Sequence, residues 1–233
     1  MRLLAIETAT ARTGVAIGDD SSMAEQVAEA PGRHTEVLAP AVAALLSARG
    51  WSPQDLDGVV VDVGPGLFTG LRVGIATAKG LAVATGVGLF AVSSTDVLAQ
   101  TACDAGVTGL VAAVVDARRR EVFWALYDVN PDGFDEVVTV AVMEPAVLAR
   151  RLDELGSLVT LVGDGAHAHR DTLGGEGCVV LDGVQVPSAA SAIRLVRTRI
   201  GTGAAACAHH EVHPWYLREA DAVANFPVRG PVA

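Results

Sequence analysis

The chain has 233 residues, enough for one large domain or two small ones, and 51% of them are hydrophobic whereas 19% are charged. A chain of this size buries roughly 70 to 75% of its unfolded surface, so it needs neither a metal nor disulfides to fold. The net charge of −10 and the aromatic content of 4% argue against a polyanion as the main direct ligand, because nucleic-acid affinity comes largely from Lys, Arg and stacking side chains.

Apolar runs and cysteines narrow the class further. No run reaches the roughly 18 to 20 residues of a membrane span, and the opening segment turns polar too early for a signal peptide, so we expect a cytoplasmic protein. Cys103, Cys178 and Cys207 are widely spaced and form no C-x-x-C pair. This spacing predicts buried, reduced thiols rather than a disulfide framework or a zinc site.

The first half of the chain is predicted to form a β-sheet covered by helices. Alternating and β-branched apolar runs predict strands at 2–6, 13–19, about 23–29, 56–63 and 88–93. Apolar residues at helical spacing predict helices at 34–49, at about 69–85, and from Ser94 or Thr95 onward. The strand at 56–63 has the continuous β-branched pattern of a strand buried on both faces, as in a parallel sheet.

The second half repeats this order of elements. Residues 109–128 are predicted to form a strand, a polar turn and a second strand that is apolar on both faces. Further strands are predicted near 136–142 and at 158–163, with helices opening at Glu144 and covering about 188–202. Two successive β-β-β-α units predict a duplicated α/β architecture, with lobes at 1–105 and 106–233.

A glycine-rich loop, DVGPGLFTGLRVG at residues 62–74, raises the question of a phosphate ligand. It is not a Walker loop, because Leu71-Arg72 stands where Lys and Ser or Thr are required, and Thr69 replaces the third glycine of a dinucleotide fingerprint. We predict Thr69 to be the N-cap of the following helix. Gly70, Gly74, Thr77 and Ala78 form a stripe of small residues, which could pack either inside the chain or against another protein.

Catalytic and metal-binding patterns are weak. His209, His210 and His213 lie close together but lack a carboxylate pair at ligand spacing, so we interpret them as a surface cluster. No G-x-S-x-G elbow is present. The arginines at 118–120 and at 194, 197 and 199 are interpreted as solvated surface. The residues alone therefore indicate no catalytic constellation.

Five segments, in the same order along the chain, resemble the TsaB family, also called YeaZ. They are LAIETATARTGVAIGD at the start, GRHTEVLAPAV at 32–42, GPGLFTGLRVGIATAKGLA at 64–82, DARRREVFWALYD at 116–128 and HPWYLRE at 213–219. The resemblance implies the duplicated, ribonuclease H-like fold that is shared by actin, the Hsp70 ATPase domain and hexokinase. It also implies a role in making threonylcarbamoyladenosine at position 37 of tRNA, as the partner of a catalytic paralogue, TsaD.

The resemblance further implies that this chain is not itself an enzyme. The H-x-x-x-H metal pair of TsaD matches Ser94 and Leu98 here, and these residues cannot replace two imidazoles. The first phosphate loop of the fold, D-x-G-[T/S], matches Glu7-Thr8-Ala9-Thr10, which has lost the glycine. We therefore expect no cofactor or metal on this chain alone, with ATP or ADP and a metal held by partner subunits, among them a TsaE-like ATPase.

The predicted interface with a TsaD-like paralogue lies on the helices at 34–49 and 69–85, and the same face would allow a homodimer when the partner is absent. Its predicted residues are His34, Leu38, Val42, Leu45, Thr69, Gly70, Val73, Gly74, Thr77, Ala78 and Leu81. Gly74→Arg is predicted to abolish pairing while leaving the chain folded. We expect tRNA to be contacted mainly through the partner, with Arg118 to Arg120 as the candidate contact on this chain.

The alternative reading is a stand-alone enzyme on the same fold. It would be either a small-molecule phosphotransferase, which needs tight ATP binding by the chain alone, or a metallopeptidase of the glycoprotease type, which needs a stoichiometric metal.

Overall fold

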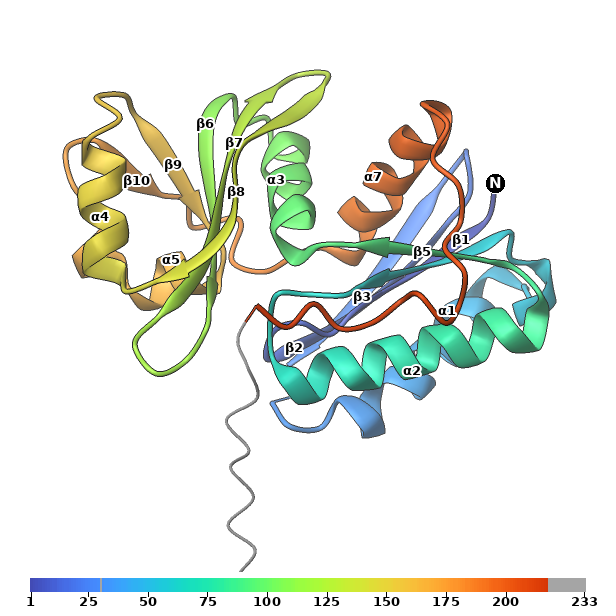
Figure 1. The fold of residues 1–233 in the computed structure, drawn as a ribbon. Helices are drawn as coiled ribbons and strands as arrows, with labels where there is room; N and C mark the ends of the chain where they lie inside the picture. Colours follow the sequence, from blue (N-terminus) through green and yellow to red (C-terminus); the bar gives the residue numbers. More distant parts are fainter. Residues whose placement is uncertain (30, 218–233) are drawn as a thin grey trace, which may run out of the picture.

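The computed structural model describes residues 1–29 and 31–217, which form two five-stranded sheets flanked by helices (Figure 1). The strand order is β3-β2-β1-β4-β5 in the first sheet and β10-β9-β6-β7-β8 in the second. From β8 to β10 the second sheet has the order β8-β7-β6-β9-β10. Counted within each half, both sheets therefore have the strand order third, second, first, fourth, fifth. The predicted duplication of an α/β unit is therefore confirmed.

The elements lie close to their predicted bounds. The first half contains β1 (Leu3–Glu7), β2 (Arg12–Gly18), β3 (Met23–Glu29), α1 (His34–Arg49), β4 (Gly58–Asp62), α2 (Phe68–Thr85), β5 (Gly88–Val92) and α3 (Ser94–Asp104). The second half contains β6 (Gly109–Asp116), β7 (Val122–Asn130), β8 (Gly133–Met143), α4 (Pro145–Asp153), β9 (Val159–Val162), α5 (Asp164–Ala168), α6 (Arg170–Leu173), β10 (Cys178–Val180) and α7 (Ala189–Gly201). The unpredicted elements, α5, α6, β10 and a 3₁₀ turn at Pro53–Asp55, have three to five residues each, too few to show a periodic pattern.

Helices and sheets alternate in layers. α1 and α2 cover one face of the first sheet and α7 covers the other, while α3 covers the inner face of the second sheet and α4, α5 and α6 cover its outer face. α3 and α7 therefore pack against each other between the two sheets (Figure 1). Within the described ranges, no helix is both long and apolar enough to cross a bilayer.

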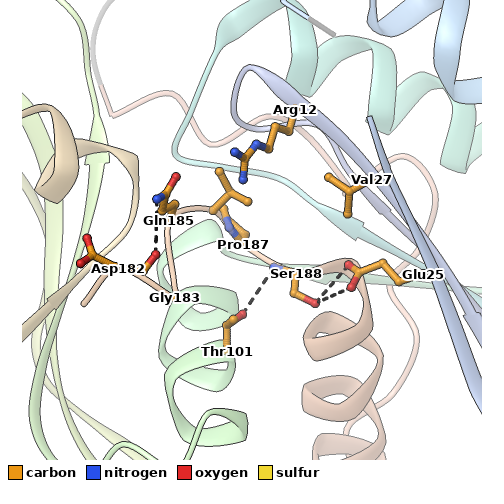
Figure 2. Close-up of a pocket in the computed structure, with 10 residues that line it drawn as sticks. Arg12, Glu25, Val27, Thr101, Asp182, Gly183, Gln185, Pro187 and Ser188 are labelled. Carbon is orange, nitrogen blue, oxygen red and sulfur yellow. Dashed lines mark hydrogen bonds between the residues drawn. The ribbon is translucent and has the colours of Figure 1, made fainter. Parts of the chain in front are cut away.

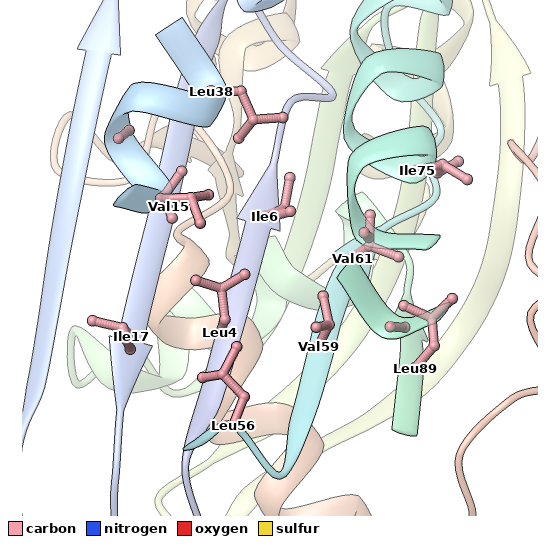
Figure 3. Packing of buried hydrophobic residues seen from close by; sticks show 14 of the residues in the cluster. Leu4, Ile6, Val15, Ile17, Leu38, Leu56, Val59, Val61, Ile75 and Leu89 are labelled. Atoms are coloured by element: carbon pink, nitrogen blue, oxygen red, sulfur yellow. The ribbon is translucent and has the colours of Figure 1, made fainter. Parts of the chain in front are cut away.

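Alternation along the central strands builds a core on each face of the first sheet. Leu4 and Ile6 of β1 point toward α1 and α2, where they meet Leu38 (Figure 3). Their neighbours Leu3 and Ala5 point the other way, toward α7. Because every residue of β1 and β4 is buried, both strands show the continuous apolar pattern typical of a sheet covered on both faces.

The two halves exchange their last helices. α3 follows β5 in the chain but packs on the second sheet, and α7 follows β10 but packs on the first sheet. The segment after α7 also returns to the first half, where the Trp215 N–H donates to the Val63 carbonyl oxygen at 2.7 Å. The domain boundary predicted after residue 105 stays a prediction. It separates the strands of the two sheets, but α3 and α7 each pack on the sheet of the other half.

The stripe of small residues on α2 faces the inside of the chain. A Cβ on Gly70 would lie 2.0 Å from the Thr8 carbonyl oxygen, and a Cβ on Gly74 would lie 2.3 Å from Thr8 Oγ1. Ala78 is fully buried in the same core. The prediction that Gly70, Gly74 and Ala78 form a surface for another protein is therefore wrong, because they let α2 pack closely on the chain itself, whereas Thr77 is half-buried.

This packing generates a paired prediction on one helix. Gly74→Ala should lower the free energy of unfolding by about 1–3 kcal/mol, because the added methyl group overpacks the contact with Thr8. Gly80→Ala should raise the free energy of unfolding by about 0.5–1 kcal/mol, because a Cβ there meets nothing within 4 Å and alanine favours the helix. Urea denaturation of both variants measures the difference, and equal effects at the two positions would contradict the inward orientation of Gly74. Gly74→Arg should accordingly unfold the chain rather than report on pairing.

Candidate functional site

The glycine-rich loop joins β4 to α2 and packs on the loop that follows β1. Gly64 has a φ of +109°, and the Gly64–Pro65 peptide is cis. A Cβ on Gly66 would lie 2.3 Å from the Ala9 carbonyl oxygen, which accepts the Leu67 N–H at 2.7 Å. The Leu67 amide is therefore bonded within the chain and is not available to a phosphate.

The start of α2 differs from the prediction. The helix begins at Phe68, and Leu67 is the N-cap residue, with φ −67° and ψ 119° and no side-chain cap. Thr69 is thus the second residue of the helix and its side chain is exposed. The predicted N-cap role of Thr69 is wrong because the chain enters the helix two residues earlier, where Leu67 makes its hydrogen bond to Ala9.

Two carboxyl groups are buried at the carboxyl ends of the neighbouring parallel strands β1 and β4. Glu7 ends β1 and Asp62 ends β4, and they are 2% and 1% exposed. Glu7 Oε1 accepts the Ala9 N–H at 2.7 Å, while Asp62 Oδ1 accepts the Gly64 N–H at 2.7 Å and the Ser94 hydroxyl at 2.8 Å. Burial, and then the charge of Asp62, raise the pKa of Glu7 well above its usual range. Glu7 Oε2 and Asp62 Oδ2 are buried without a hydrogen-bond partner among the described residues, so burial beside Asp62 favours the protonated form of Glu7.

A related pair of carboxyl groups lies at the equivalent place in the second sheet. Asp116 ends β6, and Asp164 follows β9 and accepts the Asp116 N–H at 3.0 Å. Burial raises the pKa of Asp164, and its charge adds to the raised pKa of Glu7. The duplicated strands thus direct four acidic residues toward the region between the lobes. In residues 1–29 and 31–217, however, no group of three or more His, Cys, Asp or Glu side chains has the arrangement of a metal site.

Ser94 and Leu98, the positions predicted to correspond to the metal-binding histidines of TsaD, have packing roles here. The Ser94 hydroxyl donates to Asp62, and Leu98 is fully buried in the core between α3 and the second sheet. His34 is also buried: its Nδ1 lies 2.8 Å from Thr13 Oγ1, and burial lowers its pKa. All three side chains are buried within the chain.

A pocket of about 480 Å³ opens between the lobes, where the segment leading into α7 passes β3 and α3 (Figure 2). Its polar groups are paired with each other or with their neighbours. The Ser188 hydroxyl donates to Glu25 at 3.1 Å and the Ser188 N–H to Thr101 Oγ1 at 3.4 Å, while Arg12 forms an ion pair with Glu29. This pairing favours a structural seam between the halves over a ligand site.

Comparison with known proteins decides the family. A model of the family described as TsaD, tRNA N6-adenosine threonylcarbamoyltransferase, matches residues 27–171. The tRNA threonylcarbamoyladenosine biosynthesis protein TsaB of Escherichia coli is 33% identical over 94% of this chain and 95% of its own length. The Bacillus subtilis protein of the same name is 32% identical over 97% of this chain and 98% of its own. The chain belongs to the TsaB family.

Solved structures agree with this assignment. YeaZ from Pseudomonas aeruginosa superposes with a TM-score of 0.82 at 27% identity, covering 93% of this chain and 99% of that one. A polyphosphate/ATP-glucomannokinase from Arthrobacter superposes with a TM-score of 0.50 at 12% identity, covering 85% of this chain and 99% of that one, which shows the fold alone. The predicted duplicated actin-like fold is confirmed.

The interface residues predicted for this TsaB-family chain differ in burial. Three are half-buried, Val73, Thr77 and Leu81, and Thr69 is exposed. Seven are buried within the chain, namely His34, Leu38, Val42, Leu45, Gly70, Gly74 and Ala78. The prediction that these seven contact a partner is therefore corrected: they form the core between α1, α2 and the first sheet.

The outer faces of the same two helices are exposed and carry mostly small side chains. On α1 the exposed residues include Ala39, Pro40, Ala43, Ala44 and Ser47, and on α2 they include Thr69, Ala76, Gly80, Val83 and Ala84. Val83 is 66% exposed. The sequence pattern missed this face because α2 carries two stripes of small residues, and helical spacing does not tell which stripe faces inward.

An aromatic and arginine cluster lies at the start of α2. Phe68 and Tyr216 are each 45% exposed and stack with their ring centroids 5.2 Å apart. The Arg72 guanidinium lies 3.7 Å from the Phe68 ring centroid, and its Nε donates to the Tyr216 hydroxyl at 2.8 Å. Aromatic residues and arginine are enriched in protein interfaces, so the cluster extends the candidate binding face of α2.

The turn between β6 and β7 has an unusual backbone. Arg118, Arg119 and Arg120 have φ values of 60°, 54° and 65°, in the left-handed region that favours glycine. Non-glycine residues pay of order 1–3 kcal/mol each for this conformation. The sequence predicted a polar turn here, but three arginines in succession gave no signal of a left-handed conformation.

The buried acid pair predicts a pH dependence of stability. Because the folded chain keeps a proton on Glu7 above pH 4.5, whereas the unfolded chain releases it, the free energy of unfolding of the wild type should fall as pH rises from about 4.5, by up to ~1.4 kcal/mol per pH unit for one proton. Glu7→Gln should make this fall smaller, because a neutral amide has no proton to release, whereas burial still raises the pKa of Asp62 and Asp164. Urea denaturation between pH 5 and 8 measures both slopes. The exposed Glu154→Gln is the control, and equal slopes for wild type and Glu7→Gln would contradict the assignment.

Proposed function

We propose that this chain is a non-catalytic subunit in the synthesis of N6-threonylcarbamoyladenosine in tRNA. The observation that carries the proposal is the near full-length similarity to two proteins named for that pathway, at 33% and 32% identity. The match to the TsaD family model adds that the chain is related to a threonylcarbamoyltransferase. The complex would act in the cytoplasm.

Several contacts support a non-catalytic role. The positions that match the TsaD metal ligands hold Ser94, whose hydroxyl is engaged by Asp62, and Leu98, which lies in a core. The glycine-rich loop is closed by contacts from Gly66 and Leu67 to Ala9. The proposal therefore assigns ATP or ADP and a catalytic metal to partner subunits rather than to this chain.

The outer faces of α1 and α2 are the proposed contact with a TsaD-like paralogue. Small exposed residues such as Ala43 on α1 and Ala76 and Gly80 on α2 let another helix approach closely, which increases dispersion contacts. Arg72, Phe68 and Tyr216 at one end supply the larger side chains that often dominate binding energy. The same face would support a homodimer when the partner is absent, and a TsaE-like ATPase is the proposed third component.

A substitution on this face tests the proposed pairing. Ala76→Arg should weaken co-purification with the TsaD-like paralogue by about 100-fold or more and abolish threonylcarbamoyladenosine formation in the reconstituted system, because an arginine blocks close approach of the helices. The fold should be unaffected, since Ala76 is exposed. Ala105→Arg, an exposed alanine at the end of α3, is the matched control. Pairing that survives Ala76→Arg would contradict the proposed face.

Ligand binding by the pure chain distinguishes the proposal from a stand-alone enzyme. Calorimetric titration with ATP should show no tight binding, because the predicted phosphate loop at residues 7–10 has Ala9 in place of glycine and is packed against Gly66 and Leu67. Elemental analysis should show no stoichiometric metal. A Kd for ATP in the micromolar range or one metal ion per chain would instead support the phosphotransferase or the metallopeptidase reading.

A further inference from the structure

The turn at residues 117–121 projects from the second sheet, at the lower left of Figure 1. Arg118 is fixed there, because its N–H donates to Asp116 at 2.8 Å and its guanidinium forms an ion pair with the same carboxylate at 3.1 Å. Arg120 is exposed, and in the described part of the chain its guanidinium forms no hydrogen bond or ion pair. One arginine thus anchors the turn while another is presented to solvent.

The backbone of this turn indicates that its side chains have a function. The Glu121 N–H donates to the Arg118 carbonyl oxygen at 3.0 Å, which closes the turn while all three arginines are left-handed. Glycine would adopt this conformation without strain. The ion pair with Asp116 accounts for Arg118 within the fold, whereas the exposed Arg120 is where a strained arginine points to a contact outside the fold, since backbone strain concentrates at binding sites.

A pocket of about 430 Å³ beside the turn combines donors and acceptors. Its lining includes Arg119, Arg120, His169 and Thr172, together with the carboxylate of Glu144, which is exposed and caps no helix amide. Glu121 also lines the pocket, so the lining carries two carboxylates beside its two arginines, and phosphate alone would use only the arginines. The ribose–phosphate backbone of RNA fits both kinds of group, because its phosphates accept from guanidinium and its 2′-hydroxyl can donate to a carboxylate.

We propose that this turn and pocket bind the ribose–phosphate backbone of RNA. Arg119 and Arg120 contact phosphate oxygens, and Glu144 accepts a hydrogen bond from a ribose 2′-hydroxyl. The choice of RNA over another polyanion rests on the proposed function in tRNA modification. The net charge of −10 does not oppose such a local site, because one or two phosphate contacts only position the RNA. They do not require the chain as a whole to bind RNA tightly.

Fluorescence anisotropy with the full chain, a labelled tRNA transcript and an RNA hairpin tests the proposal. Arg120→Gly should weaken RNA binding about fivefold to tenfold and lower the slope of log K against log salt by about 0.7 to 0.9, the value for one phosphate contact. Its melting temperature should be equal or higher, because glycine relieves the strained φ. Arg150→Ala, an exposed arginine on α4, should leave binding unchanged.

Two further arms identify the ligand. Glu144→Gln should weaken binding of the RNA hairpin but not of a DNA hairpin of the same sequence, because only RNA has the 2′-hydroxyl. Millimolar inorganic phosphate should not displace the RNA. The proposal would be overturned if Arg120→Gly and Arg150→Ala bound RNA with equal affinity. It would also be overturned if RNA and DNA bound equally and Glu144→Gln had no effect, or if phosphate displaced the RNA completely.

The result is separable from the proposed function. If modification requires this chain but Arg120→Gly binds RNA as the wild type does, only the RNA site is refuted. If Arg120→Gly loses RNA binding but the wild-type chain is not needed for tRNA modification, the RNA site stands and only the subunit role is refuted.

Discussion

The close backbone contact between the loop after β1 and the start of α2 determines much of this molecule. Gly66 and Gly70 each lie so near that loop that a Cβ would fall within 2.3 Å of a carbonyl oxygen, and Thr8 Oγ1 donates to the Gly70 carbonyl oxygen at 2.8 Å. The contact seats α2 over the end of β1, which buries His34 and the inner stripe of α2. It also fixes which face of α2 remains exposed. The glycines therefore act on any partner interface indirectly, by orienting the helix.

The same contact encloses Glu7 and Asp62. Two ionised carboxylates buried at neighbouring strand ends would repel each other, which favours a proton on Glu7, and one oxygen of each residue accepts a backbone N–H. In the described part of the chain, no Lys or Arg forms an ion pair with either residue. The second sheet repeats the theme at Asp116 and Asp164, where Arg118 forms an ion pair with Asp116 from the turn. Both sheets thus have acidic residues at or just after the ends of their strands. In the second sheet Asp116 is paired with an arginine, whereas in the first sheet burial raises the pKa of Glu7.

Most strands and helices could be predicted because their patterns are local. The apolar runs in β4 and in most of β7 follow from burial on both faces of a covered sheet. The orientation of α2 could not be predicted, because Gly70, Gly74 and Ala78 and the exposed Thr69, Ala76 and Gly80 are equally small. The acid pair was equally invisible: Glu7 and Asp62 are 55 residues apart in sequence, and only the parallel pairing of β1 with β4 joins them. The left-handed arginines gave no signal, because such turns are normally recognised by glycine or asparagine.

Two exposed surfaces, the outer faces of α1 and α2 and the β6–β7 turn, differ in the kind of contact that they favour. The outer faces of α1 and α2 offer close packing, which suits a lasting contact with another helix, whereas the β6–β7 turn offers a few charges, which suit a weak and salt-sensitive contact. An acidic chain gains little from such a contact alone. In the proposed complex, a partner that also binds the RNA would make the second contact intramolecular, and its effective concentration would reach the millimolar range. A modest local affinity would then be enough to orient an RNA that the partner already holds. This benefit would offset the loss of stability that the strained arginine turn causes.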